Sequence, residues 1–327
     1  MLSRRTVVLA LLASFAAANP FEVHESRAAD FPTKTVRIVI PFSAGGAPDV
    51  LMRIVVPHLS EKWKQPIVIE NRPGANTNIG TVAVTKAEAD GHTLLFTTDG
   101  TFIFNPLIYA SMPYSVSELT PVSLVATASS MFAVGTHIPA KTVSEFIALA
   151  KAKPGTLNYG STGPASVQRL QMEYFATITG VQLLHVPFKG ANETMMAMVA
   201  NQIDSSITSS SNILPLMPKG TVRALAISTA KRSPKAPEVP TMQEAGVEGY
   251  ETQSLFGLFA PAGTPADAIK KIHADLTEVT MRPQIQELLS TRSFEVEGKT
   301  GAEFQKIIDR DTAKWRKVIT AAKIRED

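Results

Sequence analysis

The chain has 327 residues, a length that is typical of two domains. Hydrophobic residues make up 44% and charged residues 19%, which excludes an intrinsically disordered chain and a coiled coil. The net charge of +3 is spread along the chain and argues against a nucleic-acid-binding protein, while the lack of cysteine excludes disulfides, thiolate metal sites and cysteine nucleophiles.

The N-terminal segment has the pattern of an export signal. Arg4 and Arg5 precede an apolar run from Val7 to Ala18, and small-residue sites suited to cleavage lie at 16–18 and 28–29. The apolar run is shorter than the roughly 20 residues that a membrane anchor needs. We therefore predict a signal peptide at residues 1–29 and a mature protein in the periplasm.

Along the rest of the chain, short β-branched runs alternate with helical patterns. The first run is Val36–Ile40, which leads through a glycine loop into a helix from about 48 to 63. Further strands are predicted at 67–70, 93–98, 157–159, 183–186, 205–208, 224–228 and 255–260, with a helix at 79–87. This alternation predicts an α/β fold with doubly wound layers.

Capping signals predict three later helices. Thr142 and Thr300 are each followed by a glutamate three residues on, the pattern of a capping box. Thr264 stands before Pro265, which suits the first turn of a helix. Trp315 lies at helical spacing among isoleucines and is interpreted as a core residue.

Three glycine-containing turns, at 42–46, 73–78 and 160–166, stand before helices. The first N–H groups of a helix have no partner within it, and the helix dipole places about half a positive charge there. Such turns can therefore hold a carboxylate or a phosphate. The alternative is that they are ordinary connections, in which glycine permits a positive φ and Ser or Asn caps the helix.

Common catalytic and nucleotide-binding motifs are missing. The chain contains no G-x-x-x-x-G-K, G-x-G-x-x-G, G-x-S-x-G or H-E-x-x-H pattern. An exported hydrolase that uses Asp49, Ser161 or His185 stays open as an alternative, although no base is evident beside a serine. His185 flanks a strand and is interpreted as structural.

Arg169 falls near the start of a predicted helix, where the dipole disfavours a cation. The position is explained if the guanidinium grips an anion with two parallel hydrogen bonds. The alternative is a solvated arginine that leans away from the helix end.

Sequence blocks at these turns resemble a known family. In chain order they are PFSAGG at 41–46, ENRPGA at 70–75, DGHTLL at 90–95, NYGS at 158–161, HVPFKG at 185–190 and APAGTP at 260–265. The chain thereby resembles the Bug-type solute-binding receptors of tripartite tricarboxylate transporters, along nearly all of its mature length.

The resemblance implies a two-lobed fold of the periplasmic binding protein type II class, with a small, mostly parallel sheet flanked by helices in each lobe. One lobe comprises residues 30–126 and 252–327, and the other comprises 127–251. The implied ligand is a small organic acid, either a mono- or a dicarboxylate, aromatic acids included. The implied partners are integral-membrane transporter subunits, contacted transiently. We expect a monomer that is not an enzyme and needs no cofactor or metal.

Site residues follow from the resemblance and from the turns. Those of the first lobe are Phe42, Ser43, Ala44, Gly45, Gly46, Asp49, Asn76 and Asn78. Those of the second lobe are Ser161, Thr162, Gly163, Ser166, Arg169, Phe188 and Lys189. Because a carboxylate would repel an anion, Asp49 is expected to stabilise its helix or fix its loop.

Arg169 stands where many relatives have histidine, and such a change favours a ligand with a second negative charge. A ligand receptor for a membrane sensor kinase stays open as a further alternative function, because the sequence does not separate it from a transport receptor.

Overall fold

The computed structural model describes residues 31–163 and 166–325. The predicted signal peptide at residues 1–29 lies outside the described residues. Within the described ranges, no helix combines the length and the apolar character that crossing a membrane requires.

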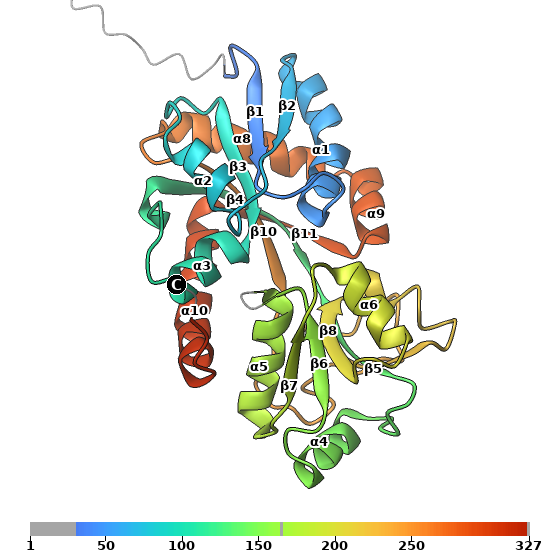
Figure 1. The fold of residues 1–327 in the computed structure, drawn as a ribbon. Coiled ribbons are helices and arrows are strands. Elements are labelled where there is room, and N and C mark those ends of the chain that lie inside the picture. Colours follow the sequence, from blue (N-terminus) through green and yellow to red (C-terminus); the bar gives the residue numbers. More distant parts are fainter. Residues whose placement is uncertain (1–30, 164–165, 326–327) are drawn as a thin grey trace, which may run out of the picture. The chain divides into compact units, whose positions relative to one another are not determined.

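A six-stranded sheet forms one lobe (Figure 1). Its strands, in the spatial order β11-β4-β10-β3-β1-β2, are β11 (Phe294–Thr300), β4 (Leu119–Ala128), β10 (Ser254–Pro261), β3 (Thr93–Thr98), β1 (Val36–Ile40) and β2 (Ile67–Asn71). β1 is parallel to β2 and β3, whereas β10 is antiparallel to β3 and β4, and β11 is antiparallel to β4.

A five-stranded sheet forms the second lobe. Its strands, in the spatial order β7-β6-β8-β5-β9, are β7 (Leu184–Pro187), β6 (Asn158–Ser161), β8 (Ser205–Ser209), β5 (Ser130–Gly135) and β9 (Val222–Ile227). β6 is parallel to β7 and β8, whereas β5 is antiparallel to β8 and β9.

Helices cover both faces of the six-stranded sheet. On one face, three helices contact one another: α1 (Ala47–Trp63), α8 (Ala266–Thr280) and α9 (Pro283–Thr291). The other face carries α2 (Asn78–Thr85), the π-helix η2 (Gly100–Phe104), α3 (Asn105–Ile108) and α10 (Gly301–Ala321); the 3-10 helix η3 (Val116–Glu118) precedes β4. Thr300 forms the predicted capping box with Glu303, and α10 then buries Phe304 and Trp315 in the core.

The second lobe has its own aromatic core. Its helices are α4 (Val143–Ala152), α5 (Val167–Thr179), α6 (Ala191–Val199) and α7 (Ser210–Ile213). The ring of Phe132 on β5 lies 5.0 Å from those of Phe146 on α4 and Phe175 on α5, measured between centroids. These contacts hold α4 and α5 against the same sheet.

Two chain crossings connect the sheets. β4 ends at Ala128 and β5 begins at Ser130, so one residue separates them. The chain returns between β9 and β10, and Ser254 at the start of β10 pairs with Ala128. The two crossings therefore lie side by side, an arrangement that suits a hinge.

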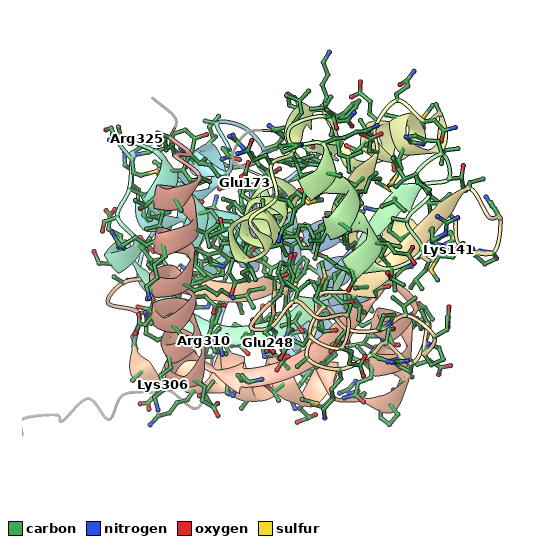
Figure 2. The ribbon with its side chains drawn as sticks, turned by 90° about the horizontal axis from the view of Figure 1, so that it is seen from below. Lys141, Glu173, Glu248, Lys306, Arg310 and Arg325 are labelled. Carbon is green, nitrogen blue, oxygen red and sulfur yellow. The ribbon has the colours of Figure 1, made fainter. Side chains whose placement is uncertain are left out.

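A helix from each lobe meets at this junction. The rings of Trp315 on α10 and Tyr174 on α5 are 5.7 Å apart between centroids, and Lys314 Nζ lies 5.9 Å from the centroid of the Tyr174 ring. Figure 2 labels Arg310 on α10 and Glu173 on α5, which locates the two helices in that view.

The predicted strands are all present. β1 and β3 have the predicted bounds, and the ends of the other predicted strands differ by at most two residues. Each sheet is mixed, so the expected parallel pairing holds only for β1 to β3 and β6 to β8. Sequence analysis missed β4, β5 and β11. β4 and β5 are buried at nearly every residue, so they lack the alternation that marks a half-exposed strand.

The helix predicted after Thr264 and Pro265 is present as α8, which begins at Ala266. Thr264 does not cap α8, because Pro265 occupies the N-cap position and makes no side-chain cap. The Thr264 hydroxyl instead donates to the carbonyl of Pro261 at 2.8 Å. Thr142 does cap α4, since its hydroxyl accepts the amide of Glu145 at 3.1 Å.

Candidate ligand-binding site

Two adjoining cavities are lined by loops of both lobes. One has a volume of about 420 Å³ and the other about 550 Å³. They share a wall made of Phe42, Thr98, Val167 and Gln168. Several lining loops follow the carboxyl ends of strands, the usual place for a ligand in an α/β sheet.

The larger cavity, here called the lysine cavity, contains two cationic side chains, Lys189 and Arg292. The N-terminal residues of α1 and α6 also line it. The rest of its wall combines hydroxyl, carboxyl, amide and aromatic groups, among them Ser43, Ser130, Ser209, Ser211, Ser254, Asp99, Gln171, Phe256 and Phe294. The smaller cavity, here called the amide cavity, is lined by uncharged polar groups, among them Asn76, Thr77, Tyr109, Thr162, Ser166 and Gln168.

The first turns of α1 and α6 leave hydrogen-bond donors at the lysine cavity. Each helix has a glycine at its N-cap, Gly46 for α1 and Gly190 for α6, so no side chain caps it. The N–H groups of both first turns therefore lack the side-chain oxygen of the N-cap residue that would otherwise accept from them, although α1 has one N–H fewer because Pro48 is its second residue. These groups and the helix dipoles favour an anion there, although each first turn also carries a carboxylate, Asp49 in α1 and Glu193 in α6.

Asp49 holds the loop at 42–46 through hydrogen bonds and does not itself line a cavity. Its side chain is buried, and its Oδ2 accepts from the Gly45 amide and from Arg53 Nε, both at 2.8 Å. Its Oδ1 accepts from Asn71 Nδ2 at 3.0 Å, and that amide also donates to the carbonyl of Phe42. Burial alone would raise the pKa of Asp49, but the hydrogen bonds from Arg53, Gly45 and Asn71 outweigh it and lower the pKa. A charged Asp49 thus holds the loop between Phe42 and Gly45.

Ser161 and His185 form a pair in the second lobe. Ser161 is fully buried, and its Oγ lies 2.6 Å from His185 Nε2 while also donating to the carbonyl of Gly163 at 3.0 Å. Burial, and then the charge of Arg169, lower the pKa of His185 to about 4, so the imidazole is neutral at pH 7. A histidine thus stands beside a serine, contrary to the expectation, but with the Ser161 proton donated to Gly163 the Nε2 of His185 is the N–H donor of the pair. Ser161 lines neither cavity, however, so its hydroxyl shapes the loop rather than meeting a substrate.

Arg169 lies in the first turn of α5, near the helix start as the sequence predicts. It is the third residue of α5, and its Nε is 3.8 Å from Oε1 of Glu173 one turn later. Glu173 also accepts from the hydroxyl of Tyr159 at 2.7 Å, so the guanidinium belongs to a cluster beside β6. Arg169 lines neither cavity, and the structure gives no support to the predicted grip on an anion.

About half of the predicted site residues line a cavity. Those that do are Phe42, Ser43, Gly46, Asn76, Thr162, Gly163, Ser166 and Lys189. Those that do not are Ala44, Gly45, Asp49, Asn78, Ser161, Arg169 and Phe188. Two residues of the second group have structural contacts instead. Asn78 Oδ1 accepts a hydrogen bond from Asn105 Nδ2 at 3.4 Å, and Phe188 packs against the second-lobe core.

Sequence reasoning missed several lining residues. Asp99 follows β3 directly, and a polar residue at the carboxyl end of a predicted strand was a usable signal. Arg292 follows α9, far along the chain from the other loops, so no local pattern pointed to it. Within the described residues, no group of three His, Asp or Glu side chains could hold a metal ion.

Comparisons with known proteins agree with this geometry. A family model described as the tripartite tricarboxylate transporter family receptor matches residues 51–324. A Pseudomonas protein from the tcbD-tcbE intergenic region is 32% identical over 291 residues, which cover 88% of this chain and 86% of that protein.

Two solved structures resemble the chain along most of its length. An R. palustris protein solved with adipate is 33% identical, with a TM-score of 0.81, covering 90% of this chain and 99% of that one. MatC from Rhodopseudomonas palustris, solved with bound malate, is 28% identical with a TM-score of 0.76, covering 88% of this chain and all of that one. These similarities confirm the two-lobed periplasmic binding protein fold.

Proposed function

Because this chain belongs to the receptor family of tripartite tricarboxylate transporters, we propose that it captures a small organic acid between its lobes and delivers it to such a transporter. Members of this family are solute-binding receptors rather than enzymes. The proposal includes mono- and dicarboxylates, aromatic acids among them. It places the protein in the periplasm after removal of residues 1–29, acting as a monomer.

The observation that carries the proposal is the meeting of two uncapped helix N-termini with two cations in one cavity. α1 and α6 begin at Gly46 and Gly190, and Lys189 and Arg292 line the same space. A carboxylate gains hydrogen bonds from amides, from hydroxyls such as Ser209 and from the cations. The bound adipate and malate of the two similar proteins support the same ligand class.

The amide cavity suits the other end of the ligand. Its polar groups carry no charge, among them Asn76, Thr162 and Gln168, so they accept either a second carboxylate or a neutral polar group. Cavities of about 420 and 550 Å³ lie within the usual range for small-molecule sites. A few charge-assisted hydrogen bonds of about 1.5 to 3 kcal/mol each, less ordering costs, support affinities near micromolar, about −8 kcal/mol.

Binding drives closure of the lobes because the full set of contacts forms only when both lobes touch the ligand. We assign residues 30–126 and 252–327 to one moving lobe and 127–251 to the other. Loop 42–46 and the start of α6 then approach the same carboxylate from opposite sides.

A thermal-shift screen tests the ligand class. The purified protein is melted with adipate, malate, glutamate and benzoate, and with adipamide as an uncharged control. A ligand that binds only the folded state raises the melting temperature by mass action. At least one acid is expected to raise it while adipamide does not; a screen in which no acid raises it contradicts the proposal.

A matched pair of variants at Gly190 tests the cavity itself. A Cβ added there meets no atom within 4 Å, and the residue does not have a positive φ, so a side chain is accommodated. Gly190→Asp adds a negative charge beside the first turn of α6, whereas Gly190→Asn adds the same shape without charge. The Asp variant is expected to bind the acid at least tenfold more weakly than the Asn variant, as measured by calorimetry. Equal affinities would contradict an anion at this helix end.

A partner-capture experiment separates transport from signalling. Membrane extracts are passed over the immobilised protein with and without the acid found in the screen. Ligand-dependent retention of transporter subunits supports delivery to a permease, whereas retention of a sensor kinase supports the alternative receptor role.

A further inference from the structure

Asp99 is a buried carboxyl group in the wall of the lysine cavity. It follows the last residue of β3 and is only 2% exposed, yet it is among the residues that line the cavity. Its Oδ1 has no hydrogen-bond partner within the described residues. An unpaired buried oxygen is costly, so a group of this kind calls for an explanation.

Burial favours the neutral form of Asp99. Burial is the largest influence and, with the nearby carboxylate of Asp311 on α10, raises the pKa of Asp99 to about 8, although the amides of Leu255 and Gly100 act in the opposite direction. Across the cavity, the charged groups in the wall are Lys189 on the loop before α6 and Arg292 after α9. At pH 7 the Asp99 carboxyl therefore keeps its proton and has an O–H group to donate.

A neutral acid in an anion site has an advantage over an ionised one. An ionised Asp99 would repel a carboxylate, whereas a protonated one adds a hydrogen-bond donor without repulsion. The helix ends and the two cations still supply the attraction. The unpaired oxygen then becomes a donor whose partner is absent until an acid binds.

We propose that the protonated carboxyl of Asp99 donates a hydrogen bond to the ligand's carboxylate in the lysine cavity, so that binding weakens as this proton is lost. This inference rests on the proposed function, and it narrows the ligand to acids that place an acceptor oxygen at Asp99. A ligand that places an ammonium group there would instead need Asp99 ionised.

Calorimetry with adipate between pH 7 and pH 9 tests the donor. If only the protonated form binds, the dissociation constant of the natural protein rises about tenfold across this range, given the pKa of about 8. Binding at pH 9 then takes up about 0.9 proton, measured in buffers of different ionisation enthalpy. Asp99→Asn keeps a donor that cannot ionise, so its affinity is expected to change less than about twofold with no proton uptake.

Asp275→Asn is the matched control. Asp275 is a buried carboxylate that accepts from Trp63 Nε1 at 2.7 Å and lines neither cavity. This variant is expected to keep the full pH dependence of adipate binding. Loss of that dependence in the control would show that a group other than Asp99 carries it and would overturn the proposal.

The remaining outcomes separate the two proposals. Adipate binding that does not change with pH overturns the donor at Asp99 and leaves the proposed function intact. Release of a proton when glutamate binds at pH 7 assigns Asp99 to an ammonium group and also overturns the donor. If no acid binds at any pH, the proposed function fails and the donor fails with it.

Discussion

Replacing Asp49 tests whether a buried carboxylate that does not line either cavity nevertheless builds the site. Asp49→Ala removes the acceptor for the Gly45 amide, for Arg53 Nε and for Asn71 Nδ2. A hydrogen bond to a charged group is worth about 1.5 to 3 kcal/mol, and two of the three donors are amides, the backbone N–H of Gly45 and the side chain of Asn71 on β2. Arg53 is 55% exposed, so solvent screens its pair with Asp49 and the pair adds little.

Since water reaches the exposed Gly45 amide in the variant, we take the lower end of the range for each amide. The expected loss in the free energy of unfolding is about 3 kcal/mol, measured by urea denaturation at pH 7. The affinity for the acid found in the screen should also fall, because loop 42–46 loses its fixed shape. Arg53→Gln, which removes only the exposed partner, is the control and should lower the free energy of unfolding much less than Asp49→Ala does.

The pH dependence of this loss follows from the lowered pKa of Asp49. A carboxyl whose pKa falls on folding stabilises the protein above its ordinary value of 3.8, and that contribution disappears as the pH falls further. The difference between the natural protein and Asp49→Ala should therefore shrink below that pH. A loss no larger than that of Arg53→Gln, or an unchanged affinity, would refute the role of Asp49.

Three other changes have outcomes that follow from single contacts. A Cβ at position 257 would lie 2.4 Å from the ring of Phe304. Gly257→Ala should therefore lower the free energy of unfolding, measured in urea, by about 1 to 3 kcal/mol. Gly190→Ala is the control, because its methyl group enters open space. Thr300→Ala removes the capping box of α10 and should cost about 1 kcal/mol by the same assay, while Thr300→Ser should restore most of it. Because burial and Arg169 lower the pKa of His185 from 6.5 to about 4, its stabilising effect is present above pH 6.5 and is lost toward pH 4. Thermal melts of His185→Gln should therefore depend less on pH in that window, and an unchanged profile would contradict the shift.

Much of the fold could be predicted from local sequence. β1 was recognisable from its β-branched run, and both β1 and β6 from the glycine turn and the helix that follow them. β4 and β5 could not be found in this way, because burial on both faces removes the alternation of polar and apolar residues. Their antiparallel pairing with β10 and β8 depends on segments more than 70 residues away, which no local pattern encodes.

The site was predictable where it follows from backbone chemistry. Helix starts at Gly46 and Ser166 could be located because glycine turns and caps have recognisable patterns. Side-chain direction was not predictable: Arg169 and Gln168 are neighbours in the chain, but only Gln168 lines a cavity. Consecutive residues in a helix point about 100° apart, so one residue of error in the helix start exchanges their roles. The proposed role of Asp99 depends on the burial of its carboxyl group, which only the folded chain shows.

The contact between Trp315 and Tyr174 gives the molecule an optical property. The chain has two tryptophans, and Trp63 stays within one lobe, where its indole donates to Asp275. Trp315 alone meets an aromatic ring of the other lobe among the described ring contacts, at 5.7 Å between centroids. Any rotation of one lobe against the other changes the surroundings of that indole. Its fluorescence, isolated by Trp63→Phe, would time the closing motion in a stopped-flow experiment without an attached dye.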